Sequence, residues 1–280
     1  MLVKEIMTTD PIVAEVPGTR EDVLRRFVQH SVSGMPVVKA KTKELAGVVT
    51  RSDVFRKAEE EQLALIMTSK PYTIRPEDPV TKAARLFFDK QIHGLPVIEG
   101  DNTLVGVLSP TDILRVLREP AGKTVSDFIK GKTAPVHEGT PLRVVWEIMR
   151  LTHSNALPVL NDEGLLTGIV ADSDLFKLSQ VDETIRRTEL GMSDQDDDWA
   201  TGDAVGNVMP LYFARSRVDL PKRPVRDIMV RDVITVFQRA SATDAAKKMT
   251  KHRINQLPVV DSNDRMVGML TDLDLMQAAF

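Results

Sequence analysis

The apolar residues of the first 60 positions follow two different periods. Between Thr19 and His30 they recur at the spacing of one helical face, and Thr19 with Asp22 three residues later has the pattern of a capping box. Short runs rich in β-branched residues predict three strands, at 11–16, 36–39 and 45–50. A second helix is predicted at 52–61. The predicted order is therefore strand, helix, strand, strand, helix, with a short helix before the first strand.

This order of elements occurs four times, marked by residues at fixed spacings. A Leu/Met-Pro-Val element contains Pro36, Pro96, Pro158 and Pro258. A glycine follows each proline by ten or eleven residues: Gly47, Gly106, Gly168 and Gly268. An aspartate follows each glycine by six residues: Asp53, Asp112, Asp174 and Asp274. An apolar residue precedes each proline by twenty-nine residues: Met7, Met67, Ile129 and Met229. Four landmarks in the same register indicate a fourfold internal duplication.

The length of one repeat constrains how the repeats must associate. A unit of about 60 residues cannot bury its sheet face alone, whereas two units can do so by packing sheet against sheet. We therefore expect the first two repeats to pair and the last two to pair, with the turn-forming stretch at 119–122 between the pairs. The predicted fold class is α/β, with four βαββα repeats.

This set of motifs resembles the cystathionine-β-synthase (CBS) domain family, in which paired repeats form units called Bateman modules. The resemblance implies four repeats, at 1–57, 61–118, 122–178 and 225–280. Repeats one and two would form the first module (1–118), and repeats three and four the second (122–280), with an insertion at 179–224. This plan is similar to that of stand-alone four-repeat archaeal proteins and of the gamma subunit of AMP-activated protein kinase.

Composition excludes several classes of function. The net charge is −3, without the basic excess typical of nucleic-acid binders. No apolar run of about 18 residues and no signal-peptide pattern is present, so we expect a cytoplasmic protein that binds neither nucleic acid nor membrane. The absence of cysteine excludes disulfides and thiolate metal sites. No P-loop, dinucleotide-binding or His-Glu-x-x-His motif occurs, and the histidines lack metal-ligand spacing, so neither catalytic residues nor a metal site are predicted.

The strand-to-helix corners contain the candidate binding residues. In three repeats a hydroxyl precedes a carboxylate by three positions: Thr50 and Asp53, Ser109 and Asp112, Thr271 and Asp274. Repeat three has Ala171 at the hydroxyl position and retains Asp174. This spacing is a helix-capping pattern, and capping alone could explain it. The alternative is ligand binding, because a carboxylate can accept hydrogen bonds from both ribose hydroxyls and free amides at a helix start attract phosphate.

The CBS resemblance implies that these corner residues contact the ribose and phosphate of an adenosine ligand, with repeat three as the weakest site. It also directs attention to the position three residues before each proline: Ser33, His93, Asn155 and Asn255. Of these, His93 and Asn255 are the candidate phosphate contacts. Arg51, Arg115 and Arg253 are either further phosphate contacts or ordinary surface charges.

The resemblance further implies an adenine pocket between the first strand and the Leu/Met-Pro strand. Its candidate residues are Ile12, Val13, Met35, Tyr72, Thr73, Leu95, Ile234, Thr235 and Leu257. For most of these residues, membership of the apolar core is the simpler interpretation.

About 40 extra residues separate repeats three and four, with an acidic stretch at 194–203, an apolar group at 211–213 and a proline-containing linker at 220–224. They are either a partner-docking or gating element or a solvated loop that joins the second module, and the loop is the simpler hypothesis.

The function expected from the resemblance is that of a regulatory sensor rather than an enzyme. It would bind AMP, ADP, ATP or S-adenosylmethionine between paired repeats, as a ligand and not as a catalytic cofactor, and pass a conformational change to a protein partner. The cationic sulfonium ligand would tolerate the neutral Ser and Asn positions, whereas a nucleotide would favour repeat two with His93. The alternatives are a ligand-free scaffold and a nucleotide-processing enzyme. The chain would act as a monomer or a homodimer.

Overall fold

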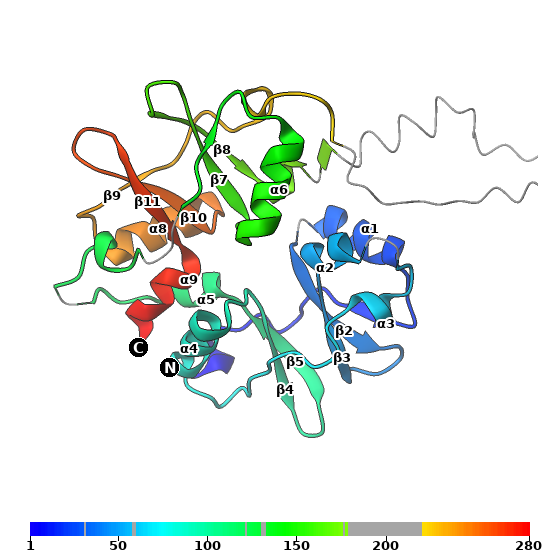
Figure 1. Ribbon diagram of the computed structural model, residues 1–280. Coiled ribbons are helices and arrows are strands. Elements are labelled where there is room, and N and C mark those ends of the chain that lie inside the picture. Colours follow the sequence, from blue (N-terminus) through cyan, green and yellow to red (C-terminus); the bar gives the residue numbers. More distant parts are fainter. Residues whose placement is uncertain (31, 58–59, 121, 130–132, 176, 179–219) are drawn as a thin grey trace, which may run out of the picture.

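The computed structural model describes residues 1–30, 32–57, 60–120, 122–129, 133–175, 177–178 and 220–280, which form four βαββα units (Figure 1). Repeat one comprises η1 (Val3–Glu5), β1 (Ala14–Val16), α1 (Arg20–His30), β2 (Gly34–Lys39), β3 (Leu45–Thr50) and α2 (Arg51–Arg56). Repeat two comprises α3 (Leu63–Ile66), α4 (Val80–Lys90), β4 (Leu95–Glu99), β5 (Thr103–Leu108) and α5 (Pro110–Leu114).

The second half of the chain repeats this arrangement. Repeat three comprises η2 (Val125–Asp127), β6 (Val136–His137), α6 (Leu142–Thr152), β7 (Ala156–Leu160) and β8 (Leu166–Ala171), followed by helical residues 172–175. Repeat four comprises η3 (Val225–Asp227), β9 (Val236–Phe237), α8 (Ala242–His252), β10 (Gln256–Val260), β11 (Met266–Thr271), α9 (Asp272–Leu275) and η4 (Met276–Ala279). In repeats one, three and four the first strand pairs in parallel with the second, which pairs antiparallel with the third. The predicted α/β class is confirmed.

Two predicted elements are shorter than the sequence pattern suggests. In repeat two the first strand is reduced to a single bridge between Ile74 and Val97, because Pro76 lacks the N–H group that the next position of the ladder requires. The helix predicted at 52–61 ends at Arg56. There the backbone of Lys57 leaves the helical region, and its amine donates to the last carbonyls of α3.

Paired repeats are joined by a reciprocal exchange of their leading segments. Thr8 of repeat one and Val107 of repeat two exchange two backbone hydrogen bonds of 2.9 Å. Val48 and Thr68 make the opposite exchange within the same module, at 3.0 and 2.9 Å. The landmark glycines explain this close approach. A Cβ on Gly106 would lie 2.9 Å from the Met7 sulfur, so each leading segment needs a glycine on its partner's strand.

The second module uses the same exchange. Ile169 and Val230 exchange hydrogen bonds of 3.0 and 2.9 Å, and Met229 packs over Gly168. Ile129 lies over Gly268 in the opposite direction. The apolar residue twenty-nine positions before each proline is therefore the side chain that covers the glycine of the partner repeat. The predicted pairing of consecutive repeats is confirmed.

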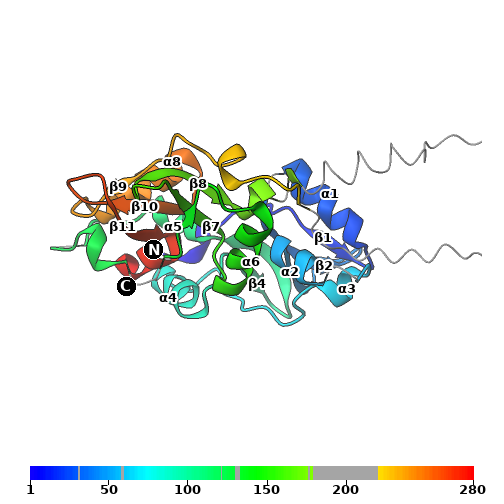
Figure 2. The same cartoon turned by 45° about the horizontal axis from the view of Figure 1, so that its top comes forward.

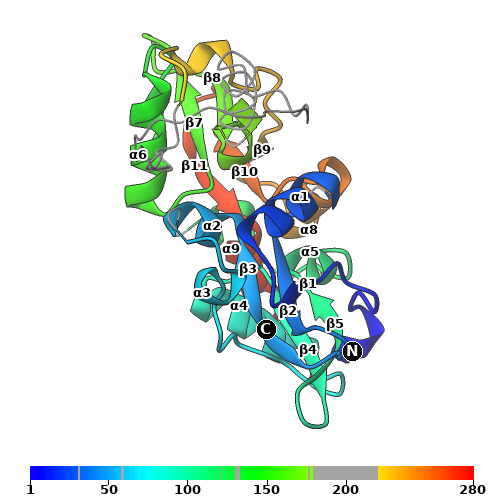
Figure 3. The same ribbon diagram turned by 90° about the vertical axis from the view of Figure 1, so that its right-hand side faces the viewer.

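The two modules pack together through repeats two and four. One buried cluster contains residues of both, including Phe87, Leu95, Leu257 and Leu273. Repeats three and one have separate clusters in the described part of the chain. Figures 1 and 3 show the first module below the second, with α9 beside α4 and α5. Figure 2 shows the flattened outline of the whole.

Most of the insertion between repeats three and four lies outside the described residues, so both hypotheses for it remain open. Its described end, 220–224, lies against repeat three. Leu220 is buried there, and the Leu142 amide donates to the Arg223 carbonyl at 3.0 Å.

Candidate functional site

Each corner between the third strand and the closing helix contains a carboxylate that caps the helix. In repeat one the hydroxyl and the amide of Thr50 donate to Asp53 Oδ2 at 2.6 and 2.9 Å, and the Asp53 amide donates back to Thr50 Oγ1 at 3.2 Å. The hydroxyls of Ser109 and Thr271 donate in the same way to the carboxylates three residues on, both at 2.7 Å. The capping part of the prediction is confirmed, and ligand contact stays a prediction.

Capping occupies only one side of each carboxylate. All of the hydrogen bonds that the strand-end hydroxyls and amides donate to these carboxylates end on Oδ2. Oδ1 of Asp112 lies 3.3 Å from Nη1 of Arg115, whose side chain is 66% exposed and can move aside. An acceptor oxygen that is not needed for capping is what a ribose hydroxyl requires.

Repeat three keeps the corner without the hydroxyl. The Ala171 amide donates to Asp174 Oδ2 at 2.9 Å, as the strand-end amide does in the other repeats. A methyl group takes the place of the hydroxyl, so this corner has one hydrogen-bonding group fewer.

The position three residues before the proline lies directly against each corner. In repeats one, three and four the first amide of the closing helix donates to its carbonyl: Arg51 to Ser33 at 3.0 Å, Asp172 to Asn155 at 2.8 Å, and Asp272 to Asn255 at 2.8 Å. In repeat two Pro110 occupies the helix start and has no N–H. Pairing of Leu95 with Leu108 still places His93, two residues before β4, beside the Ser109 corner.

His93 makes an ion pair with the opposite module. Its Nε2 lies 3.5 Å from Oδ1 of Asp272, which is 3% exposed and also accepts the Leu273 amide at 2.8 Å. Burial lowers the pKa of His93, but the hydrogen bond and charge of Asp272, with the charge of Asp172, outweigh it and raise the pKa above its ordinary value. The candidate phosphate contact of repeat two is thus already paired with a carboxylate of repeat four.

Asp172 and Arg51 bring the other two repeats to the same junction. Burial raises the pKa of Asp172, and Asp174 adds to this, while Arg51 and His93 act in the opposite direction. Nε of Arg51 is buried and has no hydrogen-bond partner in the described part of the protein. Module one therefore supplies cations to this junction and module two supplies carboxylates.

A protein-family model described as "CBS domain" matches the chain at residues 3–60, 62–119, 125–180 and 225–280. The chain belongs to the CBS-domain family. Protein MJ1225 of Methanocaldococcus jannaschii is 25% identical, with 98% of each chain covered. Its crystal structure, described as that of a candidate archaeal homologue of γ-AMPK, has a TM-score of 0.78 at 22% identity over the full length of both chains.

Two further proteins are similar to this chain. The crystal structure of an uncharacterized conserved protein from Pyrococcus horikoshii has a TM-score of 0.69 at 25% identity and covers both chains fully. CBSX2 of Arabidopsis thaliana is 25% identical over 56% of this chain and 64% of its own length. The structure of CBSX2 was determined in complex with AMP, and it covers 56% of this chain and 96% of that one with a TM-score of 0.40 at 22% identity.

The residues proposed for adenine contact are distributed between the cores and the surface of the CBS repeats. Met35, Leu95 and Leu257 are buried, at 4%, 0% and 0% exposure. Ile12, Val13 and Ile234 are partly buried hydrophobic residues packed against the cores. Tyr72 is 49% exposed, with the Lys90 amine 5.4 Å from its ring centre, and Thr73 and Thr235 are half-buried. The fully buried residues are core members in this state, and their contact with adenine stays a prediction.

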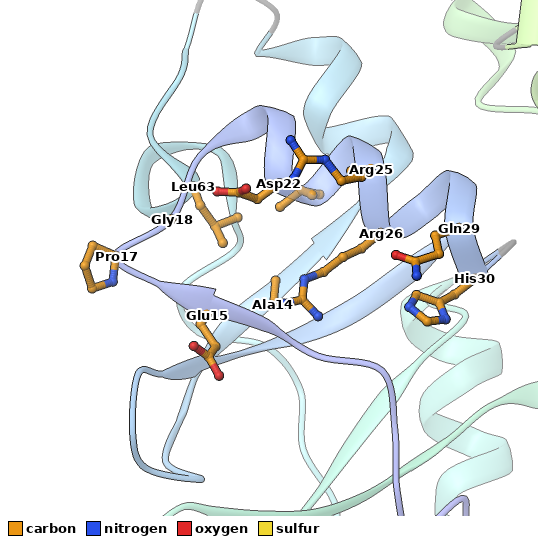
Figure 4. Close-up of a pocket in the computed structure, with 11 residues that line it drawn as sticks. Ala14, Glu15, Pro17, Gly18, Asp22, Arg25, Arg26, Gln29, His30 and Leu63 are labelled. Carbon is orange, nitrogen blue, oxygen red and sulfur yellow. The ribbon is translucent and has the colours of Figure 1, made fainter.

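A cavity of about 480 Å³ lies in repeat one between α1 and β1, and its lining includes neither Thr50 nor Asp53 (Figure 4). Arg26 projects into it from α1. The corresponding residues of repeats two and three, Leu86 and Ile148, are apolar and pack against the cores. In repeat four Lys248 spans this gap and donates to the Thr235 carbonyl at 2.7 Å. The cavity thus occurs where repeat one lacks the apolar side chain.

The described residues contain neither a candidate metal site nor a candidate membrane-spanning helix. No group of three or more His, Cys, Asp or Glu side chains among them could hold a metal ion. No helix in the described ranges is long and apolar enough to cross a membrane.

The roles of Asp172 and Asp272 were not predicted from the sequence. Both occupy the position directly after the last residue of the third strand, where Arg51 stands in repeat one. The sequence did contain a signal, because three of the four repeats have a charged residue at the first position of the closing helix. A charged residue at such a position is usually expected to be solvated.

Proposed function

We propose that this CBS protein is a regulatory sensor that binds adenosine-containing ligands at its strand-to-helix corners and does not catalyse a reaction. The observation that carries the proposal is the corner geometry. Four carboxylates are held at helix starts through Oδ2, beside the position three residues before the proline. A corner of this kind offers a ribose an acceptor oxygen that is already fixed in place, so little ordering is needed on binding.

The architecture supports regulation because the corners lie near the contact between modules. The residue three before the proline in repeat two touches α9 of repeat four. A ligand that contacts such residues binds with different affinities to different packings of the modules. Binding can shift the equilibrium between the packings by no more than this difference in affinity. A protein partner, or a second copy of the chain, would receive the change.

The ligand class is tested by thermal unfolding with AMP, ATP, S-adenosylmethionine and adenosine. A ligand that binds only the folded state raises the melting temperature, by an amount that grows with its concentration. We expect at least one of these adenosine compounds to do so. A melting temperature that no compound changes would support the alternative of a ligand-free scaffold.

The corner carboxylates are tested by calorimetry on the variants Asp112→Ala and Asp274→Ala. Each should weaken binding of the active ligand by about 1–3 kcal/mol, since ribose hydroxyls lose their acceptor. Asp174→Ala in repeat three should have the smallest effect. Asp22→Ala is the matched control, because Asp22 forms the same capping box with Thr19 at the start of α1, outside any corner. Equal affinities in all four variants would show that these carboxylates serve only as caps.

The alternative of an enzyme is tested with the same protein preparation. Incubation with ATP or S-adenosylmethionine should give no turnover above the rate without protein. Product formation that a single corner substitution abolishes would contradict the proposal.

A further inference from the structure

One charged residue from each repeat reaches the junction between the modules. Arg51 and His93 belong to module one, and Asp172 and Asp272 belong to module two. The packing of α9 against α4 and α5 places Asp272 near His93, beside the core that repeats two and four share (Figure 1). Two cations therefore face two carboxylates across the module boundary.

Asp272 is fixed in this junction more firmly than a surface acid. Its amide donates to the Asn255 carbonyl at 2.8 Å, and its Oδ1 accepts the Leu273 amide at 2.8 Å. Only 3% of its surface is exposed. Because a buried carboxylate is unfavourable unless it is paired, His93 is a required partner of Asp272 and is not available as a free cation.

The pair lies next to the repeat-two corner, where the proposed function places a ribose. His93 precedes β4 by two residues, and the pairing of β4 with β5 sets it beside Ser109 and the Asp112 carboxylate. A phosphate on that ribose would meet the Asp272 carboxylate, with the charge of Asp172 also acting on His93. Because Asp272 is buried while the His93 side chain is 38% exposed, solvent would screen this repulsion less than it screens repulsion between two surface charges.

We propose that Asp272 determines the specificity of the repeat-two corner, by excluding ligands with a 5′-phosphate and leaving room for adenosine ligands whose 5′-group is a neutral thioether or a cationic sulfonium. This inference rests on the proposed function, since it assumes that the corner binds a nucleoside. Neutralising Asp272 should free His93 for a phosphate without changing the groups that hold the ribose.

The test compares two probes that differ only at the 5′-position, AMP and 5′-methylthioadenosine, by calorimetry on the full chain. The wild type should bind methylthioadenosine more tightly than AMP. Asp272→Asn should raise the affinity for AMP at least tenfold and change that for methylthioadenosine less than threefold. Adding Asp112→Ala to this variant should remove the gain if it arises at the repeat-two corner. The matched control is Asp232→Asn, which makes the same charge change at an exposed position of repeat four.

The outcomes separate this inference from the proposed function. Binding of methylthioadenosine with an unchanged AMP ratio in Asp272→Asn overturns the role of Asp272 alone, as does a wild type that prefers AMP. Absence of binding of both probes to wild type and variant contradicts the proposed function itself. If Asp272→Asn does not fold, Asp272→Ser makes the same comparison, because its hydroxyl can still accept the Leu273 amide.

Discussion

The hydroxyl at the end of the third strand is a helix cap whatever it binds. Thr271→Ala removes the hydrogen bonds of Thr271 Oγ1 with Asp274 and should lower the free energy of unfolding by about 0.5–2 kcal/mol, as measured by urea denaturation. Repeat three offers the reverse experiment, because Ala171→Thr restores the missing hydroxyl and should raise that free energy. A loss in both variants would mean that the corner of repeat three differs in backbone geometry and not only in its side chain.

Residues differ in how far the sequence could predict their contacts. The bond between Thr50 and Asp53 was predictable because it spans three positions within one helix start. The pair of His93 and Asp272 was not, since it depends on how two modules dock and no local pattern encodes that arrangement. Asp112 shows an intermediate case, where the cap was foreseen and the ion pair with Arg115 was not.

At the scale of elements, the landmark glycines fix the contact between paired repeats. An alanine at Gly47 would put its Cβ 2.6 Å from the Thr68 carbonyl oxygen, which belongs to the backbone and cannot rotate away. Gly47→Ala should therefore lower the free energy of unfolding by about 1–3 kcal/mol, the usual cost of overpacking. Thermal and urea unfolding measure this loss. The control is Gly94→Ala, where no atom lies within 4 Å of the added Cβ, and a change above about 0.5 kcal/mol there would contradict the steric explanation.

The spacing of these landmarks was visible in the sequence, but their meaning was not. A glycine ten or eleven residues after each proline suggested a structural requirement, and only the paired repeats show that Met7 covers Gly106 and Met67 lies over Gly47. Strand prediction failed in repeat two for a different reason. The residues around Ile74 have strand composition, whereas Pro76 removes the donor that the next bridge would need.

For the whole molecule, the shared core of repeats two and four makes the two modules interdependent. Phe87 lies in that core at 0% exposure, and its counterpart in repeat one, Phe27, lies in a separate cluster at 2% exposure. Replacing either with alanine should cost about 3–5 kcal/mol. Hydrogen exchange distinguishes them, because Phe87→Ala should increase exchange in β10 and β11 of repeat four and Phe27→Ala should not. Equal exchange in repeat four for both variants would argue against a shared core.

The ion pair between His93 and Asp272 should make the stability of the protein depend on pH. The pKa of His93 is raised in the folded protein, so the folded state holds this proton more tightly than the unfolded state, whose histidine has a pKa of about 6.5. The stabilisation is therefore complete below that value and is lost as pH rises through the folded pKa. Urea unfolding should therefore show stability falling as pH increases from about 5.5 to about 8.5. This range extends about one unit or more on either side of the pKa of histidine in the unfolded state.

One other group at the junction determines how that pH profile is interpreted. Asp172, which also faces His93, has a raised pKa and contributes a slope of the same sign, so Asp172→Asn provides the background in which the contribution of His93 is measured. In that background His93→Gln should flatten the remaining slope. His252→Gln, an exposed histidine at the end of α8, should leave the slope unchanged. If the pH dependence of the unfolding free energy persists after His93→Gln in the Asp172→Asn background, protonation of His93 does not hold the two modules together. The contact between the modules would then depend on the apolar core alone.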